Sequence, residues 1–184
     1  MSYGYSIQPN LLPESLANQL VLHIHSDKAP TYKPAGIGRQ KTQQHNPEIR
    51  RDKTAWTDQE RCRADHDWHL WSERLRHHLN RELLLGLSPI ESHYACYQKG
   101  DFYSKHMDAF HGQSNRRLSL VAFLNPRWQS ENAGQLVLYT GVDNTTRVQV
   151  SPMLGTVAFF MSTEIPHEVL PTTCTRHSIA GWYG

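Results

Sequence analysis

Residues 156–183, TVAFFMSTEIPHEVLPTTCTRHSIAGWY, decide the fold class. They contain three short segments of mainly apolar, β-branched and aromatic residues, at 156–161, 167–170 and 176–183, with proline, serine and threonine between them. Short runs of this kind, bounded by turn-forming residues, are typical of β-strands. The C-terminal end of the chain is therefore predicted to be β-structure.

The same pattern continues back along the chain as far as Pro89. Five further strands are predicted, at residues 92–98, 102–107, 117–124, 135–139 and 147–150. Eight short strands separated by Gly, Pro and Asn favour a mainly β fold of the sandwich or jelly-roll type.

The first part of the chain carries helical patterns instead. Pro13, followed by Leu16, Leu20 and Ile24, predicts a short amphipathic helix that ends near Ser26. A second helix is predicted to begin at a cap formed by Asp65 or Asp67 and to end near Gly86, with an apolar stripe of Trp68, Trp71, Leu75, Leu79 and Leu83. Both helices are expected to pack on the outer face of one sheet.

Residues 28–51 break the helical pattern with three prolines and two glycines among polar and basic residues. A loop of this length inside a compact domain is usually a lid or a binding loop. We expect it to clamp a substrate, and a solvated linker is the alternative.

The bulk composition bounds the remaining possibilities. A chain of 184 residues predicts a single domain, with a helical and loop part at 1–88 and a β core at 89–184. The formal net charge of +2, with no basic leader and no long apolar run, predicts a cytoplasmic protein with neither a nucleic-acid nor a membrane partner. No long apolar stripe demands an obligate assembly, which is compatible with a monomer. Three cysteines without Cys-x-x-Cys spacing indicate reduced thiols and argue against a disulfide framework or a structural zinc site.

The main chemical signal is His106-Met107-Asp108, followed far downstream by His167. Two imidazoles and one carboxylate can occupy one face of an octahedral ion, as in the facial triad of non-haem iron(II) oxygenases. Residues 106 and 108 would point to the same side of a strand, and His167 is expected from a facing strand. His66 and His69 are also spaced for a metal, but a solvated helix face is the preferred interpretation.

Arg176 strengthens the prediction, because it follows His167 by nine residues and lies in an apolar strand. A buried arginine is costly without an anionic partner. A dicarboxylate bound to iron through a 2-oxo acid end would present its far carboxylate to this guanidinium, which forms a bidentate fork. A structural ion pair is the alternative.

Several motifs together resemble the prolyl hydroxylase branch of the iron(II)- and 2-oxoglutarate-dependent oxygenases. They are Tyr94-Ala95-Cys96-Tyr97, the segment from Tyr103 to Asp108, Phe123-Leu124-Asn125, Ala133-Gly134-Gln135-Leu136, and Pro166-His167-Glu168-Val169 through Arg176 to Trp182. Ile49-Arg50-Arg51-Asp52-Lys53 with Trp56 extends the likeness, which covers about residues 49–183. The closest resemblance is to the hypoxia-inducible-factor prolyl hydroxylases and to the bacterial prolyl hydroxylase that modifies elongation factor Tu.

The resemblance implies a double-stranded β-helix, a cupin-like jelly roll, with iron(II) held by His106, Asp108 and His167. It implies 2-oxoglutarate and O2 as co-substrates, ascorbate as a candidate stimulant, and hydroxylation of a peptidyl proline with release of succinate and CO2. By matched position, the co-substrate would meet Arg176 and Tyr97, and the protein substrate would meet Tyr103, Trp182, Arg50, Asp52 and Arg116.

One departure from the family pattern concerns Phe123. The animal relatives place a tyrosine at this position, and its hydroxyl helps to hold the far carboxylate. Phe123 cannot donate that bond, so affinity for 2-oxoglutarate is expected to be lower unless another donor replaces it.

Two other functions stay open at this point. A hydroxylase of a small metabolite or free amino acid would carry the same ligands, and a non-catalytic jelly-roll module would keep the fold alone. The nucleic-acid demethylases of the superfamily have a further arginine beyond the co-substrate arginine, and the chain has none after Arg176.

Overall fold

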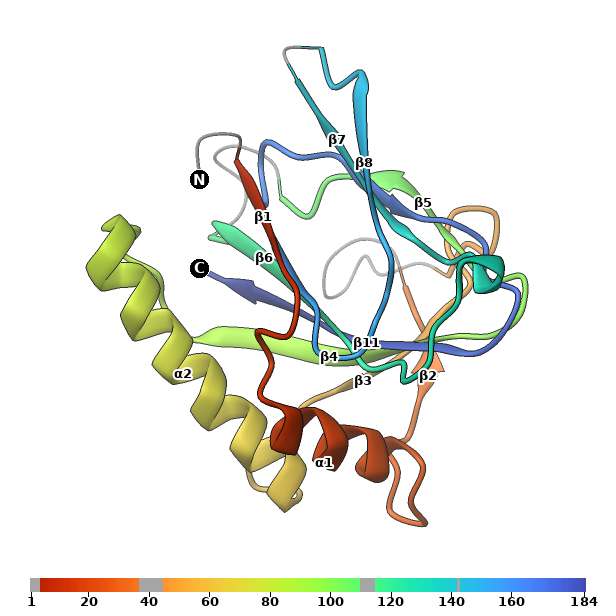
Figure 1. Ribbon diagram of the computed structural model, residues 1–184, viewed down its shortest axis with the longest axis horizontal. Helices are drawn as coiled ribbons and strands as arrows, with labels where there is room; N and C mark the ends of the chain where they lie inside the picture. Colours follow the sequence, from red (N-terminus) through yellow and green to blue (C-terminus); the bar gives the residue numbers. More distant parts are fainter. Residues whose placement is uncertain (1–3, 37–44, 110–114, 142) are drawn as a thin grey trace.

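The computed structural model describes residues 4–36, 45–109, 115–141 and 143–184 (Figure 1). Its helices are α1 (Glu14–Ile24), α2 (Arg63–Leu83) and the short 3-10 turn η2 (Ser130–Asn132). In chain order the strands are β1 (Tyr5–Gln8), β2 (Lys33–Pro34), β3 (Lys53–Trp56), β4 (Ile90–Tyr97), β5 (Tyr103–His106), β6 (Leu118–Phe123), β7 (Leu136–Thr140), β8 (Thr146–Val150), β9 (Val157–Met161), β10 (His167–Val169) and β11 (Arg176–Tyr183).

These strands form two antiparallel sheets that face each other as in a jelly roll (Figure 1). The larger sheet has the order β1-β9-β6-β11-β4-β3-β2, and the smaller one has the order β5-β10-β7-β8. Both α-helices cover the outer face of the larger sheet (Figure 1). The prediction of a mainly β jelly roll with helices on one sheet is confirmed.

All eight predicted strands are present, and their ends differ from the prediction by at most two residues. The prediction missed β1, β2 and β3, which are short and lie at or near the edges of the larger sheet. The strand β2 falls inside the predicted loop at 28–51, so that prediction is wrong at Lys33–Pro34. The part of this loop at residues 37–44 lies outside the described residues.

The second helix begins earlier than predicted, and its cap is neither Asp65 nor Asp67. Cys62 is the N-cap, and its sulfur accepts a hydrogen bond from the backbone N–H of Asp65 at 3.4 Å. The carboxylate of Asp65 points inward and accepts a hydrogen bond from the hydroxyl of Tyr94 at 2.5 Å. An interior partner therefore removes Asp65 from the capping role that its position suggests.

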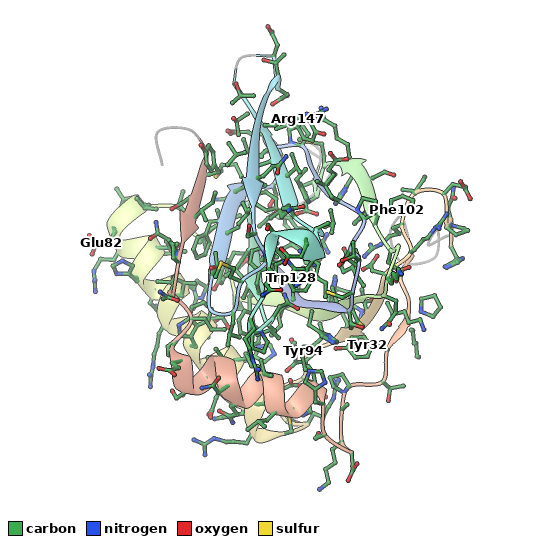
Figure 2. All side chains as sticks on the ribbon, turned by 45° about the vertical axis from the view of Figure 1, so that its right-hand side comes forward. Tyr32, Glu82, Tyr94, Phe102, Trp128 and Arg147 are labelled. Carbon is green, nitrogen blue, oxygen red and sulfur yellow. The ribbon has the colours of Figure 1, made fainter. Side chains whose placement is uncertain are left out.

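The larger sheet separates two apolar layers because its side chains alternate between faces. One layer, between this sheet and the helices, includes Tyr94, which Figure 2 labels, with Leu20 and Trp68. The other layer, between the two sheets, includes Ala95 and Tyr97 from the same strand β4. Within the described part of the chain, no helix is long and apolar enough to cross a membrane.

Candidate active site

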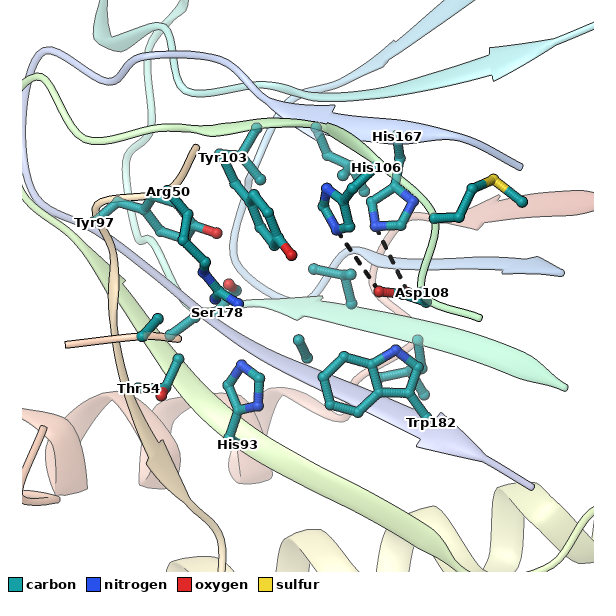
Figure 3. A pocket seen from close by; sticks show the side chains of 18 of the residues that line it. Arg50, Thr54, His93, Tyr97, Tyr103, His106, Asp108, His167, Ser178 and Trp182 are labelled. Carbon is teal, nitrogen blue, oxygen red and sulfur yellow. Dashed lines mark ion pairs between the residues drawn. The ribbon is translucent and has the colours of Figure 1, made fainter. Parts of the chain in front are cut away.

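His106, Asp108 and His167 meet between the two sheets. His106 ends β5, His167 begins β10, and the two residues are partners in the antiparallel register. The Nε2 atom of His106 lies 3.7 Å from Oδ1 of Asp108, and Nε2 of His167 lies 3.6 Å from Oδ2 (Figure 3). The three side chains offer ligand atoms that all lie within 4.8 Å of one another, as a single metal ion requires. The prediction that His106 and Asp108 lie in one strand is wrong, since β5 ends at His106 and Asp108 lies in a bend beyond it.

Each of the three side chains is oriented by a second contact. Nδ1 of His106 lies 2.8 Å from the carbonyl oxygen of Ser104, and Nδ1 of His167 lies 3.2 Å from that of Ile165. If Nδ1 carries the proton in both rings, each Nε2 directs a lone pair toward the shared space. The hydroxyl of Ser119 on β6 donates to Oδ2 of Asp108 at 2.6 Å. Such outer contacts are typical of protein metal centres.

The protonation states also fit a divalent cation. Burial lowers the pKa of His167 to about 4, so this imidazole is neutral at pH 7. Burial by itself raises the pKa of Asp108, but the two imidazoles and the Ser119 hydrogen bond outweigh it and hold that pKa below its usual range. The site thus combines a buried carboxylate with nitrogen lone pairs, a donor set that suits iron(II).

The triad lines a cavity of about 500 Å³, and Arg176 lines the same cavity. Arg176 is 1% exposed. Its Nε donates to the carbonyl of Gly134 at 2.8 Å and its Nη1 to the hydroxyl of Ser178 at 3.2 Å. Its Nη2 is buried and has no hydrogen-bond partner among the described residues.

Aromatic rings enclose this guanidinium on the remaining sides. Its Cζ lies 4.9 Å from the ring centre of Tyr97 and 5.3 Å from that of Phe123. Burial lowers the pKa of Arg176, but a guanidinium stays charged in proteins. Within the described part of the chain no carboxylate pairs with it, so the structural ion pair considered above does not form. A buried cation that lines a cavity and keeps an unused donor fits the carboxylate of a small diacid.

Two neighbouring strands supply one wall of the cavity through their alternate residues. From β4 these are His93, Ala95 and Tyr97, and from β11 they are Arg176, Ser178, Ala180 and Trp182. The alternation follows from the two-residue period of a strand. One strand, β11, therefore reaches from the cationic end of the cavity to an indole ring.

The predicted substrate residues lie around this cavity, with one exception. Arg50, Tyr103, Arg116 and Trp182 line it. The ring of Tyr103 stacks on His106 with centres 3.5 Å apart, and the guanidinium of Arg50 lies 4.1 Å from the Tyr103 ring centre. Asp52 is buried and accepts two hydrogen bonds from Arg50, at 2.7 and 2.6 Å. It therefore holds Arg50 in place without lining the cavity.

The structure adds residues to the cavity that the sequence reasoning did not place in the site, among them His93, Trp56 and Ser178. The ring of His93 lies beside that of Trp182 (Figure 3), with centres 5.3 Å apart, and its centre is 5.2 Å from that of the Trp56 ring. Burial lowers the pKa of His93 to about 4, so its ring is neutral. Side chains alternate along β4, so His93 points to the same face as Tyr97, and this spacing could have identified His93 from the sequence. His66 and His69 are not in either of the potential metal-binding groups among the described residues.

Comparisons with known proteins give a consistent result. Residues 92–184, which are half of the chain, match the profile of the 2OG-Fe(II) oxygenase superfamily. A crystal structure of a prolyl-4-hydroxylase from Pseudomonas putida superposes with a TM-score of 0.87 at 32% identity, over 99% of this chain and 92% of that one. A prolyl hydroxylase of Trichoplax adhaerens, solved with a hypoxia-inducible-factor peptide fragment, gives a TM-score of 0.80 at 28% identity, over 98% of this chain and 83% of that one.

Curated relatives match a smaller part. The human prolyl hydroxylase EGLN3 is 30% identical over 91 residues, which are 48% of this chain and 38% of that protein. The matched region is thus well under half the length of this relative.

Proposed function

The chain belongs to the 2OG-Fe(II) oxygenase superfamily, and from this membership we propose that it hydroxylates a proline residue in a protein substrate. The observation that carries the proposal is one cavity that joins a His-Asp-His triad, an arginine with an unused donor, and an aromatic wall. The triad fits the family's iron(II), and the arginine fits 2-oxoglutarate.

The cavity residues would bind two different groups, iron(II) and 2-oxoglutarate. His106, Asp108 and His167 would hold the iron, and Arg176 would bind the far carboxylate of 2-oxoglutarate, with Tyr97 beside it. With iron and 2-oxoglutarate bound, O2 would be the oxidant: one of its oxygen atoms would end in succinate as 2-oxoglutarate loses CO2, and the other would be inserted into a substrate C–H bond. The protein contributes by fixing the ligands, excluding water and presenting one C–H bond in a fixed geometry.

The aromatic end of the cavity supports a proline-containing segment as substrate. Trp56 and Trp182 present indole rings, and Trp56 is 54% exposed. Proline-rich segments adopt an extended helix that docks well on aromatic grooves. Arg50 is held by Asp52, and the guanidinium of Arg116 lies 3.8 Å from the Trp182 ring centre. In this proposal both arginines would meet the peptide main chain.

A small metabolite or free amino acid is the second candidate substrate. The observation in its favour is the cavity volume of about 500 Å³, which lies in the range of ordinary small-molecule pockets. A non-catalytic module is disfavoured by the triad and Arg176, which are all in place.

The decisive experiment incubates the protein with iron(II), 2-oxoglutarate and an array of proline-containing peptides. We expect succinate formation together with the mass increase of one oxygen atom on proline, and neither in Asp108→Ala. Succinate that rises with free amino acids or metabolites, but with no peptide of the array, would support the second candidate.

A further inference from the structure

A second group of metal-ligating side chains lies on the other side of the larger sheet. His23 in the last turn of α1, Cys62 at the N-cap of α2 and Asp65 in its first turn have ligand atoms that all lie within 4.8 Å of one another. We propose that these three residues form a zinc site that is separate from the His106–Asp108–His167 centre. The chemistry proposed for the cavity makes no use of this group.

The distances between the side chains support a single ion. The sulfur of Cys62 lies 3.6 Å from Nε2 and 3.9 Å from Nδ1 of His23. Zinc bonds of about 2.0–2.3 Å place tetrahedral ligand atoms roughly 3.3–3.8 Å apart. The sulfur–nitrogen separation is already in that range, and small side-chain rotations can bring the carboxylate to the same centre.

The carboxylate of Asp65 is held by two hydrogen bonds, as ligating carboxylates commonly are. Its Oδ1 accepts a hydrogen bond from the hydroxyl of Tyr94 at 2.5 Å, and its Oδ2 accepts one from the backbone N–H of Asp58 at 3.0 Å. Each oxygen keeps a further lone pair. Hydrogen bonds that fix a ligating carboxylate are a regular part of protein metal centres.

The charge at this position also favours a cation. The side chain of Asp65 is completely buried, and its nearest basic partner, Arg61, approaches only to 3.7 Å with a side chain that is 37% exposed. A buried carboxylate needs a close countercharge. A zinc ion bound to this carboxylate and to a Cys62 thiolate would be neutralised by them and would complete that compensation.

The ligand types separate this site from the one in the cavity. The cavity centre offers nitrogen and oxygen, whereas the second group includes a thiolate, which selects zinc over harder ions. The two sites are on opposite faces of the larger sheet, because Tyr94 packs with the helices and Ala95 packs between the sheets. The zinc would bind the end of α1 to the beginning of α2, which pack together in the fold (Figure 1).

The spacing of these residues in the sequence does not match a known zinc-binding motif. His23 and Cys62 are 39 positions apart, on different helices, so the absence of a Cys-x-x-Cys motif does not bear on it. The expectation that the chain lacks a structural zinc site rested on the odd number of cysteines and on the missing motif, and neither counts histidine or aspartate ligands from elsewhere in the chain.

The test uses Co(II) as a spectroscopic probe for zinc, in the full chain carrying His106→Ala so that the cavity centre is disabled. We expect one equivalent of Co(II) to produce a thiolate-to-cobalt charge-transfer band and the visible bands of a tetrahedral ion. Zinc should displace the Co(II), so that these bands disappear, and should raise the melting temperature of the protein. Cys62→Ser should abolish the charge-transfer band, and since serine is a good N-cap, α2 should stay folded.

The controls isolate the ligand set. Cys174→Ser removes another partly exposed thiol and should leave the band unchanged. His23→Gln spares the cap and should weaken Co(II) binding by more than the roughly 10–100-fold expected for the outer contact removed in Tyr94→Phe. A folded parent chain that gives no band, or a band that survives in Cys62→Ser, would overturn the zinc site while leaving the proposed hydroxylase intact.

Discussion

The hydroxyl of Ser178 lies 3.2 Å from Nη1 of Arg176, two positions along the same strand. Ser178 of β11 is directly opposite Phe123 of the neighbouring strand β6. A serine hydroxyl therefore contacts the guanidinium beside Phe123, where the resemblance to the animal prolyl hydroxylases implies a tyrosine. Since Ser178 also lines the cavity, its hydroxyl is a candidate replacement for the one that Phe123 lacks.

Ser178→Ala should weaken binding of 2-oxoglutarate by roughly 10–150-fold, because a hydrogen bond to a charged group contributes about 1.5–3 kcal/mol. Calorimetric titration of the Mn(II)-loaded protein measures this without turnover. Adding Phe123→Tyr to Ser178→Ala should recover part of the affinity. Unchanged affinity in Ser178→Ala would show that the hydroxyl does not support the site.

Gly134→Ala should destabilise the protein and weaken co-substrate binding together. Gly134 has φ +64, and an added Cβ would lie 3.0 Å from Cβ of Thr172 and 3.2 Å from Cδ of Arg176. We expect a loss of about 1–3 kcal/mol in the free energy of unfolding from strain, and a displaced carbonyl that no longer accepts the Nε bond. Gly100→Ala is the matched control, because its φ is +85 and its Cβ would meet nothing within 4 Å. Equal binding losses in both variants would contradict the role given to Gly134.

Ser119→Ala should weaken metal binding by roughly 10–100-fold, as expected for an outer-shell partner. The change removes the hydroxyl that donates to Asp108 at 2.6 Å and leaves all three ligands. Electron paramagnetic resonance of Mn(II) during titration reports the free and bound ion. Ser72→Ala removes another buried serine hydroxyl, one bonded to α2 carbonyls far from the triad, and should bind Mn(II) normally.

The stability of the metal-free protein should fall as the pH decreases from about 6.5 to about 4. Burial, with the nearby charges of His25 and Arg176, lowers the pKa of His177 from 6.5 to about 4. Above pH 6.5 the imidazole of His177 is neutral in the folded and in the unfolded protein. Between pH 6.5 and about 4 it binds a proton in the unfolded chain but not in the folded one, so a falling pH favours unfolding.

His177→Phe should make urea unfolding less sensitive to pH between 7 and 5. The contribution of His177 has an upper bound of about 3 kcal/mol, since one pKa unit corresponds to about 1.4 kcal/mol. His66→Phe changes an exposed imidazole of α2 and should leave the pH dependence as it is. Equal pH dependence in His177→Phe and the parent would rule out His177 as a contributor.

Much of the fold could be predicted because its signals are local. Turn residues bound each of the eight strands, and the triad and Arg176 were identified from residue type and order. The backbone around Asp108 was less predictable, since this residue lies in a bend after the end of β5. The inward-pointing carboxylate of Asp65 is bonded to Tyr94, a partner 29 positions away, and the helix is capped by Cys62 instead. Such contacts arise from tertiary packing and produce no periodic pattern in the sequence from which they could be predicted.

Alternate side chains of β11 face the cavity, so one strand carries both the proposed co-substrate anchor, Arg176, and the proposed substrate contact, Trp182. A deletion of one residue between Arg176 and Trp182 would reverse the faces of the residues on one side of it, so these two side chains could no longer both face the cavity. Either the co-substrate end or the substrate end of the cavity would then lose its β11 side chain. Selectivity in this scaffold can therefore diverge through replacement of individual side chains, whereas length changes within β11 are expected to be lethal to catalysis.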